Sequence, residues 1–301
     1  MSQPVVALKI DVDTYIGTRD GVPVLLDLLA RHAARGTFYF CLGPDHTGRA
    51  LRRIVTHKGF LQKALRSGAP SAYGLKTMLY GVLLPGPVIY QKCGEIMRQT
   101  EQQGHEVGIH AWDHTKWHDF LLKSDLSFAK SELGQAANGF KQVFDRLATT
   151  TAAPGWTVSP DSLILQDQMG LSYCSDSRGS HPFYPVMNGQ RFSTLQIPTT
   201  LPTADELLGR DGLTPDDLPE YYLQQLKPGL NVLTIHTELE GGVILNSFSR
   251  LLGLLQQHNI SCITLAEASK QVTDAPACKL EMGMIAGRSL PVALQGDEVA
   301  A

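Results

Sequence analysis

Residues 5–13 read Val-Val-Ala-Leu-Lys-Ile-Asp-Val-Asp, an apolar run that ends in two carboxylates. A short run of this kind is typical of a buried strand. Alternate side chains of a strand point to the same face, so Asp11 and Asp13 are expected to lie together at its end. Two close, buried carboxylates favour a cation or a shared proton that relieves their repulsion. The alternative is that one aspartate caps the next helix and the other is solvated.

Strands and helices are expected to alternate along the chain. Further apolar runs predict strands over 37–42, 106–110, 195–199, 231–236 and 260–265. Helical spacing of apolar residues predicts helices over 22–34, 90–103, 127–148, 162–169 and 244–258. Such alternation favours a parallel α/β sheet or barrel. We therefore expect one α/β domain, sheet or barrel, over residues 1–272.

Composition and charge exclude several classes of protein. A chain of 301 residues that is 43% hydrophobic is long enough to bury a large core, and a net charge of −3 gives no reason to expect a nucleic-acid partner. Five cysteines without paired spacing predict reduced thiols, as in the cytoplasm. Neither a signal peptide nor an apolar stretch of about 20 residues is found, so we expect a cytoplasmic protein without a transmembrane helix.

Two segments break the alternation. Residues 46–94 contain no Asp or Glu and place many cations among Leu, Phe, Tyr and Val. The cations singled out are Arg49, Arg52, Arg53, Lys58, Lys63 and Arg66. This pattern predicts a basic amphipathic insertion that binds an anionic lipid surface, packs as a solvated helix, or meets nucleic acid. Residues 273–301 mix Gly, Ala and Pro with isolated apolar residues and are expected to form a loosely packed C-terminal extension.

Histidines form the other candidate cluster. Residues 108–114, Gly-Ile-His-Ala-Trp-Asp-His, place His110 and His114 four apart, so that one helical turn can aim both at one metal ion. The alternative is a pair of hydrogen-bonded core or loop residues. A later predicted strand ends at His236. Because the carboxyl ends of barrel strands converge, Asp11, Asp13, His110 and His236 are expected to meet.

One carboxylate and two histidines leave open positions on an ion, which suits Zn²⁺ hydrolysis or Fe(II) chemistry. A spare carboxylate and a spare histidine favour hydrolysis, because an Fe(II) oxygenase would leave Asp11 and His236 without roles. A third alternative is a non-catalytic lipid-surface or nucleic-acid binder that uses residues 46–94.

The order Asp-x-Asp, His-x-x-x-His and Leu-x-x-His resembles the polysaccharide deacetylase family, the family 4 carbohydrate esterases. The resemblance implies an irregular (β/α) barrel, here with the basic amphipathic insertion. It also implies a divalent metal ion held by Asp13, His110 and His114, with zinc favoured and manganese, cobalt or iron possible. Asp11 would be the general base and His236 the general acid.

One family motif is altered. Where the family has Arg-x-Pro-aromatic, residues 152–156 read Ala-Ala-Pro-Gly-Trp, so the arginine that normally holds the base is absent. Asp176 and Arg178, after another predicted strand, are the possible orienting residues, and Arg178 is the hypothetical substitute for the missing arginine. Replacing Arg178 with Ala should then lower turnover sharply without loss of metal.

Motifs at 11–14, 17–23, 43–45, 105–114, 196–203, 209–211 and 285–288 resemble a narrower bacterial group. Its members are deformylases of 4-deoxy-4-formamido-L-arabinose carried on undecaprenyl phosphate, and they also lack that arginine. The resemblance implies release of formate from this lipid-linked sugar, in the pathway that adds aminoarabinose to lipid A and gives resistance to polymyxin and cationic peptides.

Because the implied polyprenyl phosphate substrate is anionic and lipid-linked, we expect residues 46–94 to bind a lipid surface rather than nucleic acid. The protein would then be peripheral on the cytoplasmic face of the inner membrane. The alternative activity is N-deacetylation of chitin-like or peptidoglycan sugars, whose substrates generally lie outside the cytoplasm.

Overall fold

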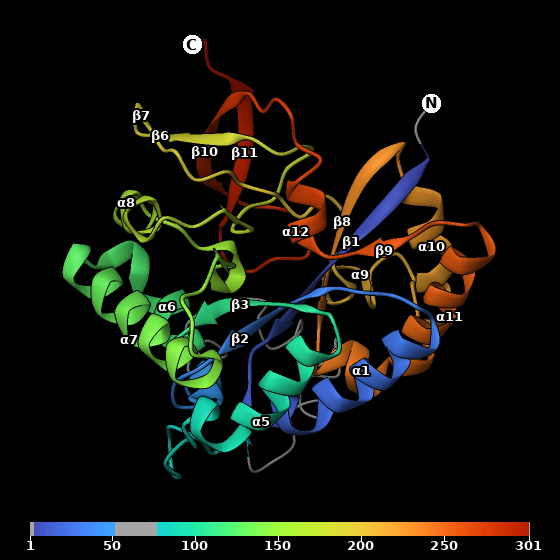
Figure 1. Ribbon diagram of the computed structural model, residues 1–301, viewed down its shortest axis with the longest axis horizontal. Helices are drawn as coiled ribbons and strands as arrows, with labels where there is room; N and C mark the ends of the chain where they lie inside the picture. The colour runs from blue at the N-terminus through green and yellow to red at the C-terminus, as the bar shows by residue number, and fades with distance from the viewer. Residues whose placement is uncertain (1–2, 52–76, 301) are drawn as a thin grey trace.

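The computed structural model describes residues 3–51 and 77–300. Within them, a parallel seven-stranded sheet is curled into a half-barrel, which confirms the predicted parallel α/β architecture (Figure 1). Its strands are β1 (Pro4–Val12), β2 (Thr37–Cys41), β3 (Glu106–Ala111), β4 (Thr150–Thr151), β5 (Tyr173–Cys174), β8 (Gly229–His236) and β9 (Cys262–Ile263). They follow the order β5-β4-β3-β2-β1-β8, and β9 pairs with β1.

One face of β1 carries apolar side chains and the other carries charged ones. Val6, Leu8 and Ile10 are buried in the largest apolar cluster, with residues of the helices on the convex side of the sheet. The outer helices are α1 (Val22–Arg31), α5 (Ile89–Gln102), α7 (Leu126–Phe144), α10 (Leu218–Gln225) and α11 (Leu245–Gln257). The alternate residues Lys9 and Asp11 point to the concave side, since successive strand side chains face opposite ways. The charged side chains of β1 therefore lie on the concave face of the sheet.

Shorter helices lie in the segments that connect the strands (Figure 1). The α-helical ones are α6 (His114–Phe120), α8 (Pro160–Met169), α9 (Ala204–Leu207) and α12 (Leu265–Ser269). The 3-10 helices are η2 (Thr47–Leu51), η3 (Leu121–Lys123), η4 (Pro154–Trp156) and η5 (Pro215–Asp217). Two π-helical turns, η1 (Gly17–Gly21) and η6 (Leu239–Val243), follow β1 and β8 and contact each other. These turns shape the loops after the two strands that carry Asp11 and His236.

A second sheet forms where a loose extension was expected. Its strands are β6 (Tyr184–Met187), β7 (Gln190–Arg191), β10 (Ala277–Gly283) and β11 (Val292–Glu298), in the order β11-β10-β6-β7. Cys278, Leu280 and Ala293 are buried in an apolar cluster with Phe183. The expectation of loose packing is wrong for residues 277–298, because strand pairing and this cluster order them. A domain boundary at residue 272 stays a prediction.

Two predicted strands differ from the structure. Residues 195–199 make only isolated bridges, through Gln196 and Thr199. Pro198 within this stretch has no backbone N–H to donate, which limits a continuous ladder. The strand predicted over 260–265 is shortened to β9, and Leu265 begins α12 instead.

The basic insertion lies partly outside the described residues. Arg52, Arg53, Lys58, Lys63 and Arg66 all fall there, so their predicted lipid contact stays a prediction. Among residues 3–51 and 77–300, we find no helix with the length and apolar character needed to cross a bilayer.

Candidate active site

Three side chains converge as a candidate metal site. Asp13 follows β1, His110 lies near the end of β3, and His114 begins α6. Each offers one ligand atom, and these atoms lie within 4.8 Å of one another. His110 Nε2 is 3.1 Å from Asp13 Oδ1, and His114 Nε2 is 3.5 Å from Asp13 Oδ2. The sequence reasoning thus grouped residues that the structure brings together, while their role as ligands stays a prediction.

The donor set fits a divalent ion. Asp13 Oδ1 is buried and has no hydrogen-bond partner of good geometry among the described residues, although His110 Nε2 is close. Burial raises the pKa of Asp13, but the imidazoles of His114 and His110 outweigh it and hold the pKa well below its usual range. A carboxylate kept ionised beside two imidazoles is a donor set that zinc and related ions accept.

Neighbouring backbone and side chains orient both histidines. His110 Nδ1 donates to the carbonyl oxygen of Ala152 at 2.6 Å, which leaves Nε2 facing Asp13. Asp113 caps α6 by accepting from Lys116 N at 3.0 Å, and its other oxygen lies 2.5 Å from His46 Nδ1. The cap fixes the first turn of α6, where His114 lies. Hydrogen bonds behind metal-binding histidines of this kind set ring orientation and tautomer.

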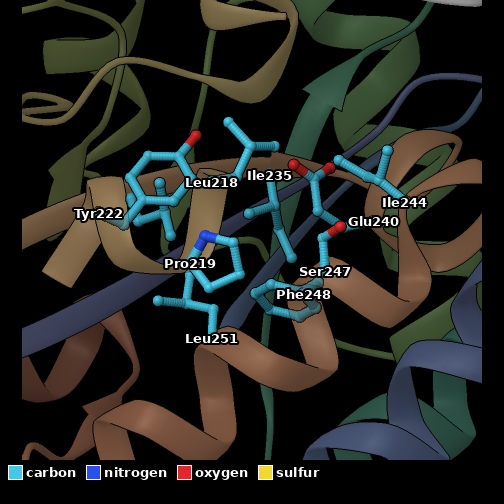
Figure 2. Close-up of a pocket in the computed structure, with 10 residues that line it drawn as sticks. Leu218, Pro219, Tyr222, Ile235, Glu240, Ile244, Ser247, Phe248 and Leu251 are labelled. Atoms are coloured by element: carbon cyan, nitrogen blue, oxygen red, sulfur yellow. The ribbon is translucent and has the colours of Figure 1, made fainter. Parts of the chain in front are cut away.

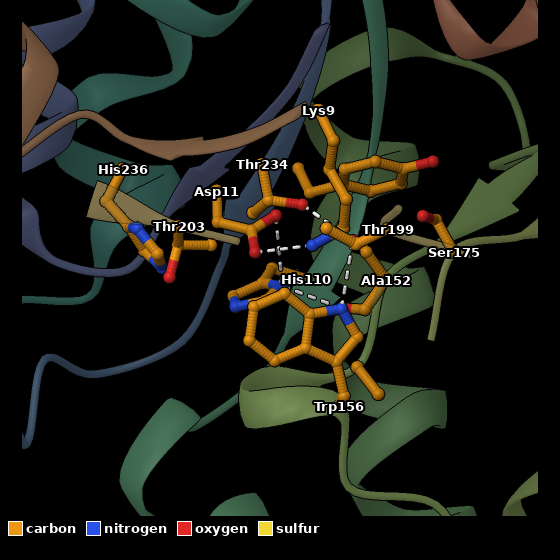
Figure 3. A network of polar contacts seen from close by, with 12 residues as sticks. Lys9, Asp11, His110, Ala152, Trp156, Ser175, Thr199, Thr203, Thr234 and His236 are labelled. Carbon is orange, nitrogen blue, oxygen red and sulfur yellow. Dashed lines mark hydrogen bonds and ion pairs between the residues drawn. The ribbon is translucent and has the colours of Figure 1, made fainter. Parts of the chain in front are cut away.

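Asp11 and His236 lie side by side. They are register partners on the adjacent strands β1 and β8, and the N–H of Thr237 donates to the carbonyl oxygen of Asp11 at 3.1 Å. Asp11 is 3% exposed and His236 is half-buried. Figure 3 shows both at one end of the strands, together with His110. The predicted convergence of these residues is therefore seen in the structure.

Arg178 does not take the place of the missing arginine. Its Nη1 donates to both carboxylate oxygens of Glu206, at 2.7 and 2.9 Å, and its Nη2 donates to the carbonyl oxygen of Leu201. The orienting role predicted for Arg178 needs a correction, because Glu206 and not Asp11 holds its guanidinium. Among the described residues, the ammonium group paired with Asp11 is that of Lys9, with Nζ 2.5 Å from Oδ2.

Asp176 orients a different group from the one expected. It is fully buried and accepts from the N–H of Ala153 at 2.6 Å and from the amides of Gln166 and Gln196 at 2.8 and 3.1 Å. Ala153 follows Ala152, whose carbonyl oxygen holds His110. Asp176 thus supports the candidate metal site through the backbone rather than contacting Asp11.

Two glutamates that follow His236 in the sequence, and that were assigned no role from it, are buried in the loop after β8. Glu238 Oε1 accepts from the N–H and hydroxyl of Thr14, at 3.0 and 2.7 Å, and so ties this loop to the one after Asp13. Glu240 Oε2 accepts from the N–H of His236 at 2.8 Å. Burial raises the pKa of each glutamate to about 8. Acidic residues directly after a strand that ends in a candidate catalytic histidine were the available signal.

Of the predicted lipid-binding cations, Arg49 lies within the described residues. Its Nε donates to the carbonyl oxygen of Gly81 at 3.0 Å, and its Nη1 is 4.0 Å from Asp113 Oδ2. Because Asp113 caps α6, Arg49 links the start of the basic segment to the helix that carries His114.

Comparison with known proteins yields relatives and a family. A family model described as polysaccharide deacetylase matches residues 1–174. A Shewanella sediminis protein named "Probable 4-deoxy-4-formamido-L-arabinose-phosphoundecaprenol deformylase" is 38% identical over 266 residues, covering 87% of this chain and 85% of that protein. A Wigglesworthia glossinidia brevipalpis protein of the same name is 31% identical over 284 residues, covering 93% and 98%.

The fold agrees with these relatives. A crystal structure of a "putative polysaccharide deacetylase" from Mycobacterium smegmatis superposes with a TM-score of 0.59 at 16% identity, covering 89% of this chain and 90% of that one. This likeness confirms the predicted barrel of the deacetylase type, whereas the basic insertion is not confirmed. Deformylases and deacetylases both hydrolyse an amide C–N bond, and the chain is a hydrolase of this kind. With a family model over residues 1–174 and a relative at 38% identity over most of its length, the chain belongs to the polysaccharide deacetylase family.

Proposed function

We propose that this hydrolase removes the N-formyl group from 4-deoxy-4-formamido-L-arabinose carried on undecaprenyl phosphate. The observation that carries the proposal is the pairing of Asp11 with His236 beside the Asp13, His110 and His114 group. The names of the two relatives support the choice of substrate. The products would be formate and the 4-amino sugar lipid, which serves lipid A modification and resistance to polymyxin and cationic peptides.

Asp13, His110 and His114 would hold the divalent ion, for which zinc is our first choice and manganese, cobalt and iron are the others. When bound, such an ion polarises a carbonyl group and lowers the pKa of a water. The residues around the site prepare it for this role. Asp13 stays ionised, and His110 is turned by Ala152 so that Nε2 faces Asp13.

Asp11 is the proposed general base. Its Oδ1 is buried and has no hydrogen-bond partner among the described residues, so a lone pair remains to accept a proton from water. His236 is the proposed general acid, which gives its proton to the departing amine. Its peptide N–H is held by Glu240, which fixes the backbone from which the imidazole projects. General acid and base groups each contribute about 10²–10⁴-fold to rate.

The lipid portion of the substrate suggests contact with an anionic membrane surface. Beyond the five insertion cations, exposed apolar side chains follow the undescribed segment: Leu79, Val82, Leu83 and Leu84, with Leu83 76% exposed. Cations beside exposed apolar groups suit the boundary between headgroups and acyl chains. We propose a peripheral position on the cytoplasmic face of the inner membrane, with no nucleic-acid partner.

Flotation with anionic vesicles tests the membrane proposal. Neutralising Arg52, Arg53 and Lys58 should cost about 3 kcal/mol of binding, near 1 kcal/mol per cation, and so deplete the floating fraction. The matched control neutralises the exposed Lys123, Lys130 and Lys141, which lie outside the insertion. Equal flotation of wild type and both variants would rule out a specific role for the insertion.

The second candidate activity is N-deacetylation of a polysaccharide, which the family description favours. Formate release from formamido-arabinosyl phosphopolyprenol, beside an N-acetylated control and with and without chelator, separates the two. We expect formate from the wild type, none with chelator, and losses of about 10²–10⁴-fold in Asp11→Asn and His236→Ala. Asp20→Asn and His258→Ala, at exposed positions, are the matched controls. Acetate release without formate release would establish the alternative.

A further inference from the structure

Lys9 is a fully buried lysine in the central strand of the sheet. Its side chain is 0% exposed, and it precedes Asp11 by two residues, so both side chains lie on the concave face of β1. Lys9 Nζ is 2.5 Å from Asp11 Oδ2. Burial of a lysine is costly unless its charge is paired, and Asp11 supplies the pairing.

Two aromatic rings restrict the lysine. Nζ lies 5.7 Å from the centroid of the Tyr39 ring and 5.2 Å from that of Trp156, within the range in which a cation is attracted to a ring face. Trp156 is itself held, because its Nε1 donates to Thr199 Oγ1 at 3.1 Å. Figure 3 shows Lys9 and Trp156 beside Asp11. The ammonium group therefore has a defined position.

The other nearby cations form their hydrogen bonds with Glu206, although the charge of Asp11 also acts on Arg288. Arg178 and Arg288 both donate to Glu206, with Arg288 Nε 2.6 Å from Oε1. Their guanidinium groups lie 5.0 and 4.5 Å from the Trp156 ring, the ring that also lies against Lys9. Trp156 thus lies near both the Glu206-bound arginines and Lys9.

We propose that Lys9 is the positioning residue for Asp11 and takes the role of the arginine that the 152–156 motif lacks. By holding Oδ2, Lys9 leaves Oδ1 without a hydrogen-bond partner among the described residues, and Oδ1 lies 4.0 Å from His110 Nδ1. This inference rests on the proposed role of Asp11 as base. The cation comes from the strand of the base itself, whereas the family motif places it on a separate loop.

A double-mutant cycle tests the role. Lys9→Met keeps the aliphatic stem and removes the charge, and a carboxylate misplaced by about 1 Å can cost about 10²-fold in rate. We expect kcat to fall by about that factor, with KM and bound metal little changed. In an Asp11→Asn background the same change should have little further effect on kcat, since the two residues act as a unit. Additive losses in the cycle would overturn the proposal.

The controls separate positioning from folding. Arg146→Met breaks a cation–carboxylate pair that no part of the proposed site uses, to Glu101 at 3.0 Å, and should leave kcat unchanged. Lys9→Arg keeps the charge and should retain kcat within about tenfold, well above Lys9→Met. If Lys9→Met does not fold, Lys9→Arg is measured in its place. A kcat of Lys9→Arg as low as that of Asp11→Asn would contradict the positioning role of Lys9.

A structural readout makes the inference independent of the substrate. If the wild type releases no formate, the proposed function has failed, and a crystal structure of Lys9→Met then decides the positioning role. We expect the Asp11 carboxylate to turn away from its wild-type position. An unchanged carboxylate would show that Lys9 does not position it.

Discussion

The Nδ1 atom of His110 lies 2.6 Å from the carbonyl oxygen of Ala152, so a backbone oxygen from a neighbouring loop fixes the ring of a candidate metal ligand. The peptide between Ala152 and its neighbour is held in turn by Asp176, through the N–H of Ala153. Second-layer contacts of this kind preserve the orientation that a ligand needs before the ion arrives.

Replacing Asp176 with Ala should weaken metal binding although Asp176 touches no ligand. The N–H of Ala153 and two glutamine amides would lose a buried acceptor, and the peptide that holds His110 would loosen. We expect metal affinity to fall by about 10–100-fold, as measured by competition with a chromophoric chelator. Asp167→Ala is the matched control, since Asp167 also accepts backbone N–H groups, of Ser193 and Thr194, but away from the site. Equal affinities in both variants would exclude this support.

Loss of a ligand should remove the metal itself. Asp13→Ala, His110→Ala and His114→Ala each delete one member of the three-residue group, leaving two donors. Elemental analysis of purified protein should show metal well below one equivalent, and formate release should stop, as it should with chelator. His118→Ala is the control, because His118 stacks on His114 at 6.3 Å but does not belong to the group. Full occupancy in His110→Ala would refute the assignment.

The candidate metal ligands could be predicted from the sequence, because strand alternation and helical spacing depend only on neighbouring residues. Asp11 and Asp13 share a face by the period of a strand, and His110 and His114 share a side by one helical turn. His236 was predicted beside them because it ends a strand, and in the structure it is the register partner of Asp11 on the adjacent strand.

Lys9 escaped prediction for a physical reason. Strand alternation places Lys9 on the same face as Asp11, but it does not show that the lysine is enclosed. That enclosure depends on Trp156, which comes from residues 154–156. Arg178 was assigned to the wrong partner because nothing local indicates Glu206, a residue 28 positions later. The second sheet was missed because β10 joins β6 across a long sequence separation.

Glu240 should make the stability of the protein depend on pH. Its carboxyl group lies in an apolar pocket among Leu218, Ile235 and Ile244, as Figure 2 shows, and burial raises its pKa from 4.5 to about 8. Because the folded-state pKa is raised, the contribution to stability is fully present below pH 4.5 and is lost as pH rises through about 8. The free energy of unfolding should fall by about 1.4 kcal/mol per pH unit within that window.

Glu240→Gln should remove this part of the slope, because the amide does not ionise and its oxygen can still accept from His236 N. Urea denaturation at several pH values between 5 and 9 measures the difference. Glu267→Gln is the control, a glutamate in the capping box of α12 that lies closer to the surface. Parallel pH profiles for wild type and Glu240→Gln would contradict a protonated Glu240 in the folded protein.

Gly17 is expected to tolerate no side chain, because of the loop contact between Glu238 and Thr14. A Cβ at residue 17 would lie 2.0 Å from Glu238 Oε1, so Glu238 would have to release Thr14 in the loop that follows Asp13. Gly17→Ala should lower the free energy of unfolding by about 1–3 kcal/mol and weaken metal binding. At Gly134, in α7, a Cβ meets nothing within 4 Å, so Gly134→Ala should instead stabilise by about 0.5–1 kcal/mol. In thermal denaturation, the Tm of Gly17→Ala should therefore fall and that of Gly134→Ala should rise. A raised Tm for Gly17→Ala would show that Glu238 can move without cost.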